Sequence, residues 1–142
     1  MKQLRNSIHS YRVRYKVDGE IHEGEYAFFF ISNSSRVAGQ PDVYFDVKLD
    51  DNMFEVAMAT VKNKKEMLKM VVLASTIDVK DIPGVTYYRT NNFDIEFLDP
   101  PKTSWCIDGE EYKTTKTSFK FEVSQEIKML VPEENINKLF EE

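Results

Sequence analysis

The strongest constraint on the fold is an alternation of apolar and polar residues, with a period of two, in many short stretches. In residues 11–17 Tyr, Val, Tyr and Val alternate with Arg, Arg and Lys, which predicts a strand with one buried and one solvated face. The same pattern recurs in 43–49, 53–61, 85–89, 93–98, 119–123 and 127–131, and the apolar run 26–31 predicts a central strand. Roughly eight or more strands joined by turns predict a mainly β fold, an antiparallel β-sandwich or half-open barrel.

One internal segment has a helical period instead. Asn63 can cap a helix and Glu66 stands three residues later, in the capping-box position. The apolar residues at helical spacing are Met67, Met70, Val71 and Ala74. We predict an amphipathic helix over 64–75, packed by these residues across the end of a sheet. A second short helix is predicted over 133–140, because Pro132 and two glutamates form a helix start.

The predicted internal helix also carries Lys64, Lys65 and Lys69. An alternative to packing on a sheet is therefore an interfacial helix, whose lysines touch anionic lipid while its apolar residues enter the membrane surface.

Composition excludes several classes of function. The 142 residues are sufficient for one domain, and the net charge of −5 with a pI near 5.2 argues against a nucleic-acid partner. A single cysteine and two histidines leave no internal disulfide or zinc-ligand spacing, which favours a cytoplasmic setting. The longest apolar stretch is too short to span a bilayer. A phosphate-binding glycine loop is also missing from the sequence.

The tripeptide Asp-Gly-Glu occurs twice, at 18–20 and 108–110. Asp-Gly between apolar runs is a hairpin signal. The first copy precedes polar residues and is interpreted as a plain turn, with Glu20 and His22 projecting to water. The second follows three bulky residues, 105–107, which are expected to bury the base of the turn. Glu110 would then emerge at the rim of an apolar floor, where a carboxylate can be held as a general base.

A second acidic feature is the turn at Asp50 and Asp51 between two predicted strands. One carboxylate and nearby backbone carbonyls at such a turn could surround a hard cation such as magnesium or calcium. The alternative is an ordinary Asx-turn, in which the side chain only caps the backbone.

The order of these motifs resembles the C-terminal domain of the diacylglycerol kinase and sphingosine kinase family of lipid kinases. The matching stretches are FFFISNSSRVAG, VKLDDNMFEV, the amphipathic helix, WCIDGEEY and a strand ending in LVP, from about Tyr11 to Pro132. The resemblance implies a β-sandwich lipid-substrate domain over 1–131, a helical tail over 132–142, and a separate N-terminal ATP-binding domain absent from this chain.

The resemblance also implies roles for particular residues. Glu110 matches the family's proton acceptor, and Asp108 and Gly109 build the turn that aims it. A structural Mg²⁺ is implied at the side chain of Asp51. Further matching positions are the backbone carbonyls of Lys48 and Met53 for the metal, and Asn33 and Gly39 for the substrate cleft. Asn52 replaces a usual glycine, and we expect it to enter the left-handed conformation.

The implied activity is transfer of a phosphoryl group from ATP to the hydroxyl of diacylglycerol or a related lipid. The implied partners are the nucleotide-binding domain and a lipid at the membrane surface, where the protein would be peripheral; a homodimer is left open. This chain alone is expected to be inactive. The alternatives are a non-enzymatic β-sandwich that binds a lipid or a protein, and a related kinase with a soluble substrate such as NAD.

Overall fold

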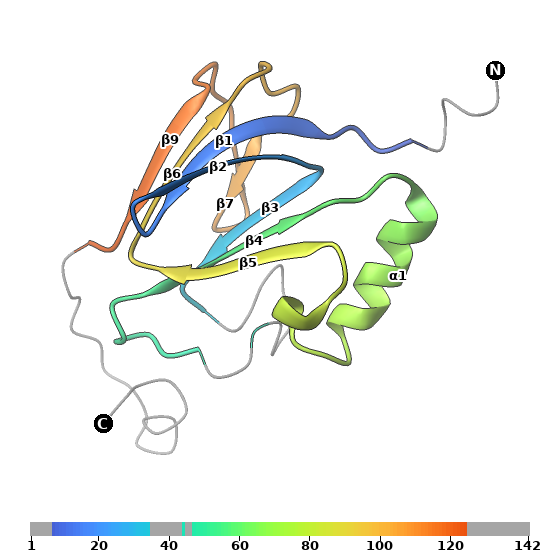
Figure 1. Cartoon of the computed structure of the whole chain (residues 1–142), viewed down its shortest axis with the longest axis horizontal. Coiled ribbons are helices and arrows are strands. Elements are labelled where there is room, and N and C mark those ends of the chain that lie inside the picture. The colour runs from blue at the N-terminus through green and yellow to red at the C-terminus, as the bar shows by residue number, and fades with distance from the viewer. Residues whose placement is uncertain (1–6, 35–43, 45–46, 125–142) are drawn as a thin grey trace.

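The computed structural model describes residues 7–34, 44 and 47–124, and its strands form antiparallel sheets with one α-helix beside them (Figure 1). The mainly β prediction with one internal helix is confirmed. The elements are β1 Tyr11–Val17, β2 Glu20–Tyr26, β3 Phe28–Ser32, β4 Phe54–Ala59, α1 Lys64–Ala74, the 3₁₀ helix η2 Val79–Asp81, β5 Val85–Thr90, β6 Asn92–Phe97, β7 Trp105–Ile107, β8 Glu110–Tyr112 and β9 Ser118–Glu122.

The larger sheet has the strand order β2-β1-β6-β9, and every neighbouring pair is antiparallel. Strand β1 alternates strictly between buried and exposed residues, as its period of two predicts. Tyr15 lies opposite Ile95 of β6, and Ile95 lies opposite Phe119 of β9. This register places the apolar residues of the sheet on one face.

The chain passes from the larger sheet to a three-stranded sheet at Ala27, whose N–H donates to the carbonyl of Ala59 at 2.8 Å. The second sheet has the order β3-β4-β5. The apolar run 26–31 was predicted to be a central strand, and this was wrong: β3 lies at the edge of its sheet. Phe28 and Phe29 are only partly buried and Phe30 is exposed, which is consistent with an edge position.

The two sheets share one apolar core. Its buried residues come from β1, β2, β4 and β6: Tyr11, Val13, Tyr15, Val17, Tyr26, Phe54, Val56, Met58, Phe93, Ile95 and Phe97. The hydroxyl of Tyr15 lies 3.2 Å from those of both Tyr26 and Tyr88. Because Tyr88 belongs to β5, these hydroxyls satisfy one another across the two sheets.

The central strand of the second sheet is β4, and all six of its residues are buried. Its second face is covered by a smaller cluster that includes Ala57, Val79, Ile82 and the partly buried Met70 and Leu73. Helix α1 and η2 therefore form a further layer beside β4 and β5 (Figure 1).

A strand predicted over 43–49 is not found in its described part, where residues 47–49 have no regular structure. The alternation over 43–49 assigns Tyr44 to the face opposite Val47, yet both residues are buried and only 2% of the Tyr44 surface is exposed. Tyr44 packs in the cluster beneath α1 and η2, 6.0 Å from the ring of Tyr87. The period of two was misleading for Tyr44, because Tyr44 and Val47 pack in the same buried cluster.

Helix α1 begins where the capping signal predicts. Asn63 accepts a hydrogen bond from the Glu66 N–H at 3.0 Å, and the Glu66 carboxylate accepts from the Lys62 N–H at 2.9 Å. The predicted inward position of Val71 was wrong, because 61% of Val71 is exposed. Leu73 packs toward the sheet in its place.

The strand over 127–131, the helix over 133–140 and the boundary at residue 131 lie outside the described residues. Within the described ranges, no helix is long and apolar enough to cross a bilayer.

We predict that Met58→Ala lowers the free energy of unfolding by about 2–5 kcal/mol, because Met58 is fully buried between the sheets and its truncation leaves a cavity. Ile21→Ala is the control, since 68% of Ile21 is exposed and a surface truncation changes stability by about 0.5 kcal/mol or less. Urea denaturation measures both. Equal effects of the two substitutions would contradict the core assignment.

Candidate functional site

The two Asp-Gly turns have the same backbone geometry. Asp18 and Gly19 have φ angles of 50° and 84°, and Asp108 and Gly109 have 49° and 88°. Positive φ at both central residues defines the tight hairpin turn that matches strand twist, and Asp-Gly is favoured there. The difference between the copies must therefore lie in what surrounds them.

The first turn is tied to the body of the protein. The buried Thr90 donates a hydrogen bond from Oγ1 to Asp18 Oδ1 at 3.0 Å. Glu20 projects into solvent as expected, with 80% of its side chain exposed. His22 does not, because its ring stacks on Tyr15 with centroids 5.2 Å apart. This copy is a structural turn that closes the β1–β2 hairpin.

The second turn closes the short β7–β8 hairpin, and Trp105 anchors that hairpin to the core. Its ring lies 5.2 Å from Phe119, 6.0 Å from Phe97 and 6.0 Å from Phe121, between centroids. Residues 105–107 were expected to bury the base of the turn, and of the three only Trp105 is partly buried. Cys106 and Ile107 are exposed, so the tip of the hairpin stands in solvent.

Glu110 is the first residue after this turn, is exposed, and lies opposite Ile107. Its neighbour Glu111 is held in place, because Ser104 Oγ donates to it at 2.8 Å and Lys113 lies 3.5 Å away. An open depression of about 520 Å³ lies beside the turn. It is lined by Lys102, Thr103, Ser104, Trp105, Cys106, Gly109 and Glu111. Glu110 itself is not among these lining residues, whereas its neighbours Gly109 and Glu111 are. A carboxylate on a tight turn near a depression can accept a proton from a bound hydroxyl.

The Asp51 turn has the predicted backbone, since Asn52 has a φ of 55° in the left-handed region. The Met53 N–H donates to Asp51 Oδ1 at 2.9 Å, which is an Asx-turn. The second oxygen of Asp51 accepts from Arg89 Nη2, and only 4% of the Asp51 side chain is exposed. Asp51 is therefore a buried carboxylate paired with a guanidinium.

A second buried carboxylate, Glu55, lies beside this pair. Arg89 Nε is 3.8 Å from Glu55 Oε1, and 1% of the Glu55 side chain is exposed. Neither oxygen of Glu55 accepts a hydrogen bond from the described residues. Burial, and then the negative charge of Asp51, raise the pKa of Glu55 to about 7, while Arg89 opposes the shift.

Sequence reasoning missed Glu55 and Arg89. Alternation along β4 assigns Glu55 to the face opposite Phe54, which is the face expected to meet water. Ala57 and Ala59, on that same face, were the available signal that another layer covers it. The cross-strand register then places Arg89 of β5 directly opposite Glu55.

The donors at this turn fit a hard cation in their chemistry. Two buried carboxylates share one guanidinium, so the cluster has an excess of negative charge, and the oxygens of Glu55 are unsatisfied. Within the described ranges, no group of three or more His, Cys, Asp or Glu side chains is arranged around one point. A cation would thus need the carbonyl donors of Lys48 and Met53, and would compete with Arg89 for Asp51.

The two residues predicted for the substrate cleft are Asn33 and Gly39. Asn33 is exposed in the bend after β3, beside a turn in which Ser34 N–H donates to Ser32 Oγ at 3.1 Å. Gly39 lies outside the described residues.

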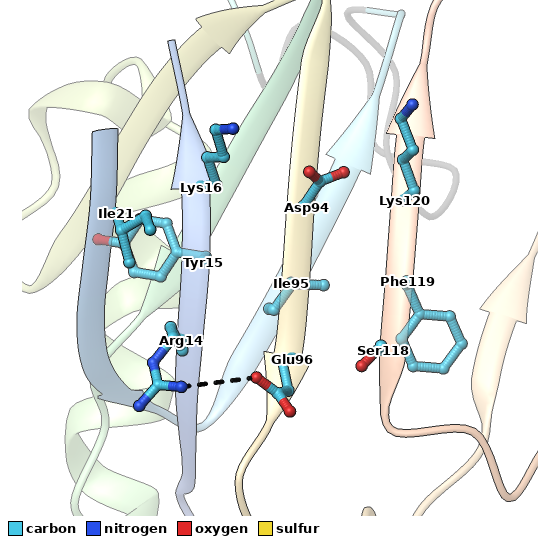
Figure 2. A pocket seen from close by; sticks show the side chains of 10 residues that line it. All are labelled: Arg14, Tyr15, Lys16, Ile21, Asp94, Ile95, Glu96, Ser118, Phe119 and Lys120. Carbon is cyan, nitrogen blue, oxygen red and sulfur yellow. Dashed lines mark ion pairs between the residues drawn. The ribbon is translucent and has the colours of Figure 1, made fainter. Parts of the chain in front are cut away.

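Another depression, of about 430 Å³, lies on the larger sheet, and no predicted site residue lines it. Figure 2 shows its lining side chains on neighbouring strands, with Arg14 of β1 facing Glu96 of β6 at 3.9 Å. Arg14 also pairs with Glu23 of β2 at 2.8 Å. Opposite charges directed across neighbouring strands are typical of a solvated sheet face, and we assign this depression no ligand.

Comparison with known proteins begins with the fold and then extends to sequence. Solved structures of Bacillus anthracis str. Sterne proteins assigned as diacylglycerol kinases match with TM-scores of 0.62 and 0.53, at 16% and 15% identity. They cover 84% and 81% of this chain, and the chain covers 38% of each. The described residues thus have the fold of one part of these larger proteins.

In sequence, the chain is 25% identical over 126 residues to diacylglycerol kinases of Staphylococcus aureus strains RF122 and JH9. The match covers 89% of this chain and 39% of each relative, so the chain spans about two fifths of their length. No family model matches the chain. The described residues form a mainly β domain of the fold seen in one part of those proteins. The chain is homologous to diacylglycerol kinases over most of its length.

We predict that Glu55→Gln stabilises the protein at pH 8 by at most about 3 kcal/mol, since each unit of pKa shift corresponds to about 1.36 kcal/mol. The folded-state pKa lies above the ordinary value of 4.5, so wild-type stability falls as pH rises from about 4.5 to 7. At pH 4.5 the two proteins should therefore be nearly equally stable. Urea denaturation in EDTA at both pH values measures this, and a pH-independent difference would contradict the shift.

Proposed function

We propose that this chain is the lipid-substrate domain of an ATP-dependent lipid kinase that phosphorylates diacylglycerol or a related lipid. The observation that carries the proposal is the homology to diacylglycerol kinases over 89% of the chain. The exposed Glu110 follows a tight turn whose Gly109 lines an open depression, and it supplies a group suited to the chemistry. The chain forms the acceptor side of a cleft whose other side is a nucleotide-binding domain.

In this proposal the lipid hydroxyl attacks the γ-phosphorus of ATP, the bond from that phosphorus to the bridging oxygen breaks, and ADP leaves. The Glu110 carboxylate accepts the hydroxyl proton. Asp108 and Gly109 hold Glu110 by fixing a backbone that few residues adopt. Positioning of this kind contributes to phosphoryl transfer, in which little covalent chemistry is left to the protein.

The metal proposal concerns the Asp51 turn. Asp51, with the backbone carbonyls of Lys48 and Met53, would hold a structural Mg²⁺. Arg89 carries one positive charge, and the two buried carboxylates carry two negative charges when both are ionised. An ion bound there would supply the missing positive charge. Asp51 in turn shapes the β3–β4 connection by capping the Met53 N–H.

The same proposal assigns partners and location. Asn33 and Gly39 contribute to the substrate cleft, the lipid is met at a membrane surface, and the protein is a peripheral cytoplasmic one. ATP is bound mainly by the nucleotide-binding domain.

We predict that Glu110→Gln lowers turnover by about 10²–10⁴-fold, the usual contribution of a positioned general base. The measurement uses the Staphylococcus aureus diacylglycerol kinase with its matching segment replaced by this chain, and follows phosphatidic acid formed from labelled ATP. Glu20→Gln is the matched control, since it follows a turn of the same geometry, and should leave turnover unchanged.

Near-normal turnover of the folded Glu110→Gln chimera would rule out the base role. A folded chimera that is inactive with Glu110 in place would contradict the proposed acceptor role. The 142-residue chain alone is expected to form no phosphatidic acid, and activity of that chain would contradict the need for a second domain.

For the metal, we predict that Mg²⁺ at about 100 times its dissociation constant stabilises the wild-type chain by about 2.7 kcal/mol relative to EDTA. Asp51→Asn should abolish this difference, because it removes the charge that binds the ion. Asp50→Asn is the control and should retain it, since Asp50 is the exposed neighbour. Thermal unfolding of the three proteins in both buffers gives the result. If the wild-type chain unfolds at the same temperature in Mg²⁺ and in EDTA, the metal assignment is wrong.

A further inference from the structure

The outward surface of α1 is apolar to an unusual degree for a helix in contact with water. Leu68, Val71 and Val72 are 64%, 61% and 58% exposed, and no residue of the helix is fully buried. Among the described residues, the helix packs through its other side, where Met70, Leu73 and Ala74 lie against the smaller core cluster. The exposed apolar residues are therefore not needed for packing.

Lysines surround these apolar residues on the helix surface. Positions three and four residues apart are neighbours on a helix, and the neighbours of Leu68 on this basis are Lys64, Lys65, Val71 and Val72. Lys69 lies four residues after Lys65 and three before Val72. We call this set the α1 patch: Lys64, Lys65, Leu68, Lys69, Val71 and Val72, all exposed.

The helix has one acidic residue, Glu66, against three lysines, so positive charge is in excess, and Glu66 forms no ion pair with any of them. Both carboxylate oxygens of Glu66 are used at the helix start, by the Asn63 side-chain amide at 3.1 Å and the Lys62 N–H at 2.9 Å. Within the described ranges, none of the three lysines of the α1 patch takes part in a side-chain ion pair. The α1 patch thus combines exposed apolar groups with locally uncompensated positive charge.

We propose that the α1 patch docks the protein on a bilayer that contains anionic lipid. The apolar side chains enter the headgroup boundary, and the lysines reach the lipid phosphates around them. The proposal deepens the proposed lipid kinase function by naming its membrane contact, but its argument is the surface of α1 alone. The net charge of −5 does not prevent docking, because charges farther than about 10 Å are largely screened at 0.1 M salt.

A protein partner fits the α1 patch less well. The buried centres of protein interfaces are depleted of lysine, whereas three of the six residues here are lysines interleaved with the apolar ones. A stable protein interface also buries about 800 Å² on each partner, which is more than six side chains on one short helix provide.

The test is flotation of the 142-residue chain with vesicles of phosphatidylcholine alone and with about 30% phosphatidylglycerol. We expect binding to the anionic vesicles only, and weaker binding as salt rises. The double variant Leu68→Ser/Val72→Ser should bind at least about tenfold more weakly. Replacing each of the three lysines by Gln should weaken binding about fivefold per lysine. Ile21→Ser is the matched control, since Ile21 is as exposed but lies on β2.

Four results would overturn the proposal. These are equal binding to neutral and anionic vesicles, an equal loss in Ile21→Ser, no binding at about 1 mM lipid, or self-association that the double variant abolishes. Circular dichroism of each variant shows that loss of binding is not loss of folding. Flotation requires no turnover, so failure of the kinase proposal and failure of the docking proposal are distinguishable.

Discussion

The rest of the structure depends on the burial of β4 on both faces. Its Phe54, Val56 and Met58 complete the core between the sheets, while the opposite face packs under α1 and η2. Burying one large apolar side chain contributes about 1.5–3 kcal/mol. Because β4 contributes residues to both clusters, its burial stabilises both of them. Glu55 lies on the second face, and a carboxylate is therefore enclosed by the same packing that stabilises the domain.

That enclosed carboxylate determines the electrostatics of the Asp51 turn. Asp51 uses one oxygen to cap its own turn and the other to pair with Arg89, so Arg89 cannot fully compensate Glu55 as well. Buried charges are costly unless they are paired. A cation bound at this turn would compensate the charge of Glu55 and so stabilise the fold.

The sequence predicts the burial of a residue well where its element has one face in water, and poorly where a further layer of structure covers that face. Strands β1 and β6 were predicted from alternation because one of their faces meets water. The same rule failed for Tyr44 and Glu55, which face a third layer, and for Val71, where the apolar stripe of the helix is wider than the surface that α1 covers. The spacing of apolar residues shows which face of a strand or helix is more apolar, but it does not show what packs against either face.

The two Asp-Gly-Glu turns extend this point to function. Their backbones are the same, so the tripeptide fixes how the glutamate leaves the turn and nothing more. Thr90 holds Asp18 against the body of the protein, whereas Trp105 holds the second hairpin at its base and leaves its tip in solvent. The second tip stands free, and Gly109 beside Glu110 lines a depression there, so this turn can present a carboxylate to a substrate carried by another surface. The distinction between a structural turn and a candidate catalytic one therefore lies in contacts with residues distant in sequence, Thr90 for Asp18 and Phe119 for Trp105.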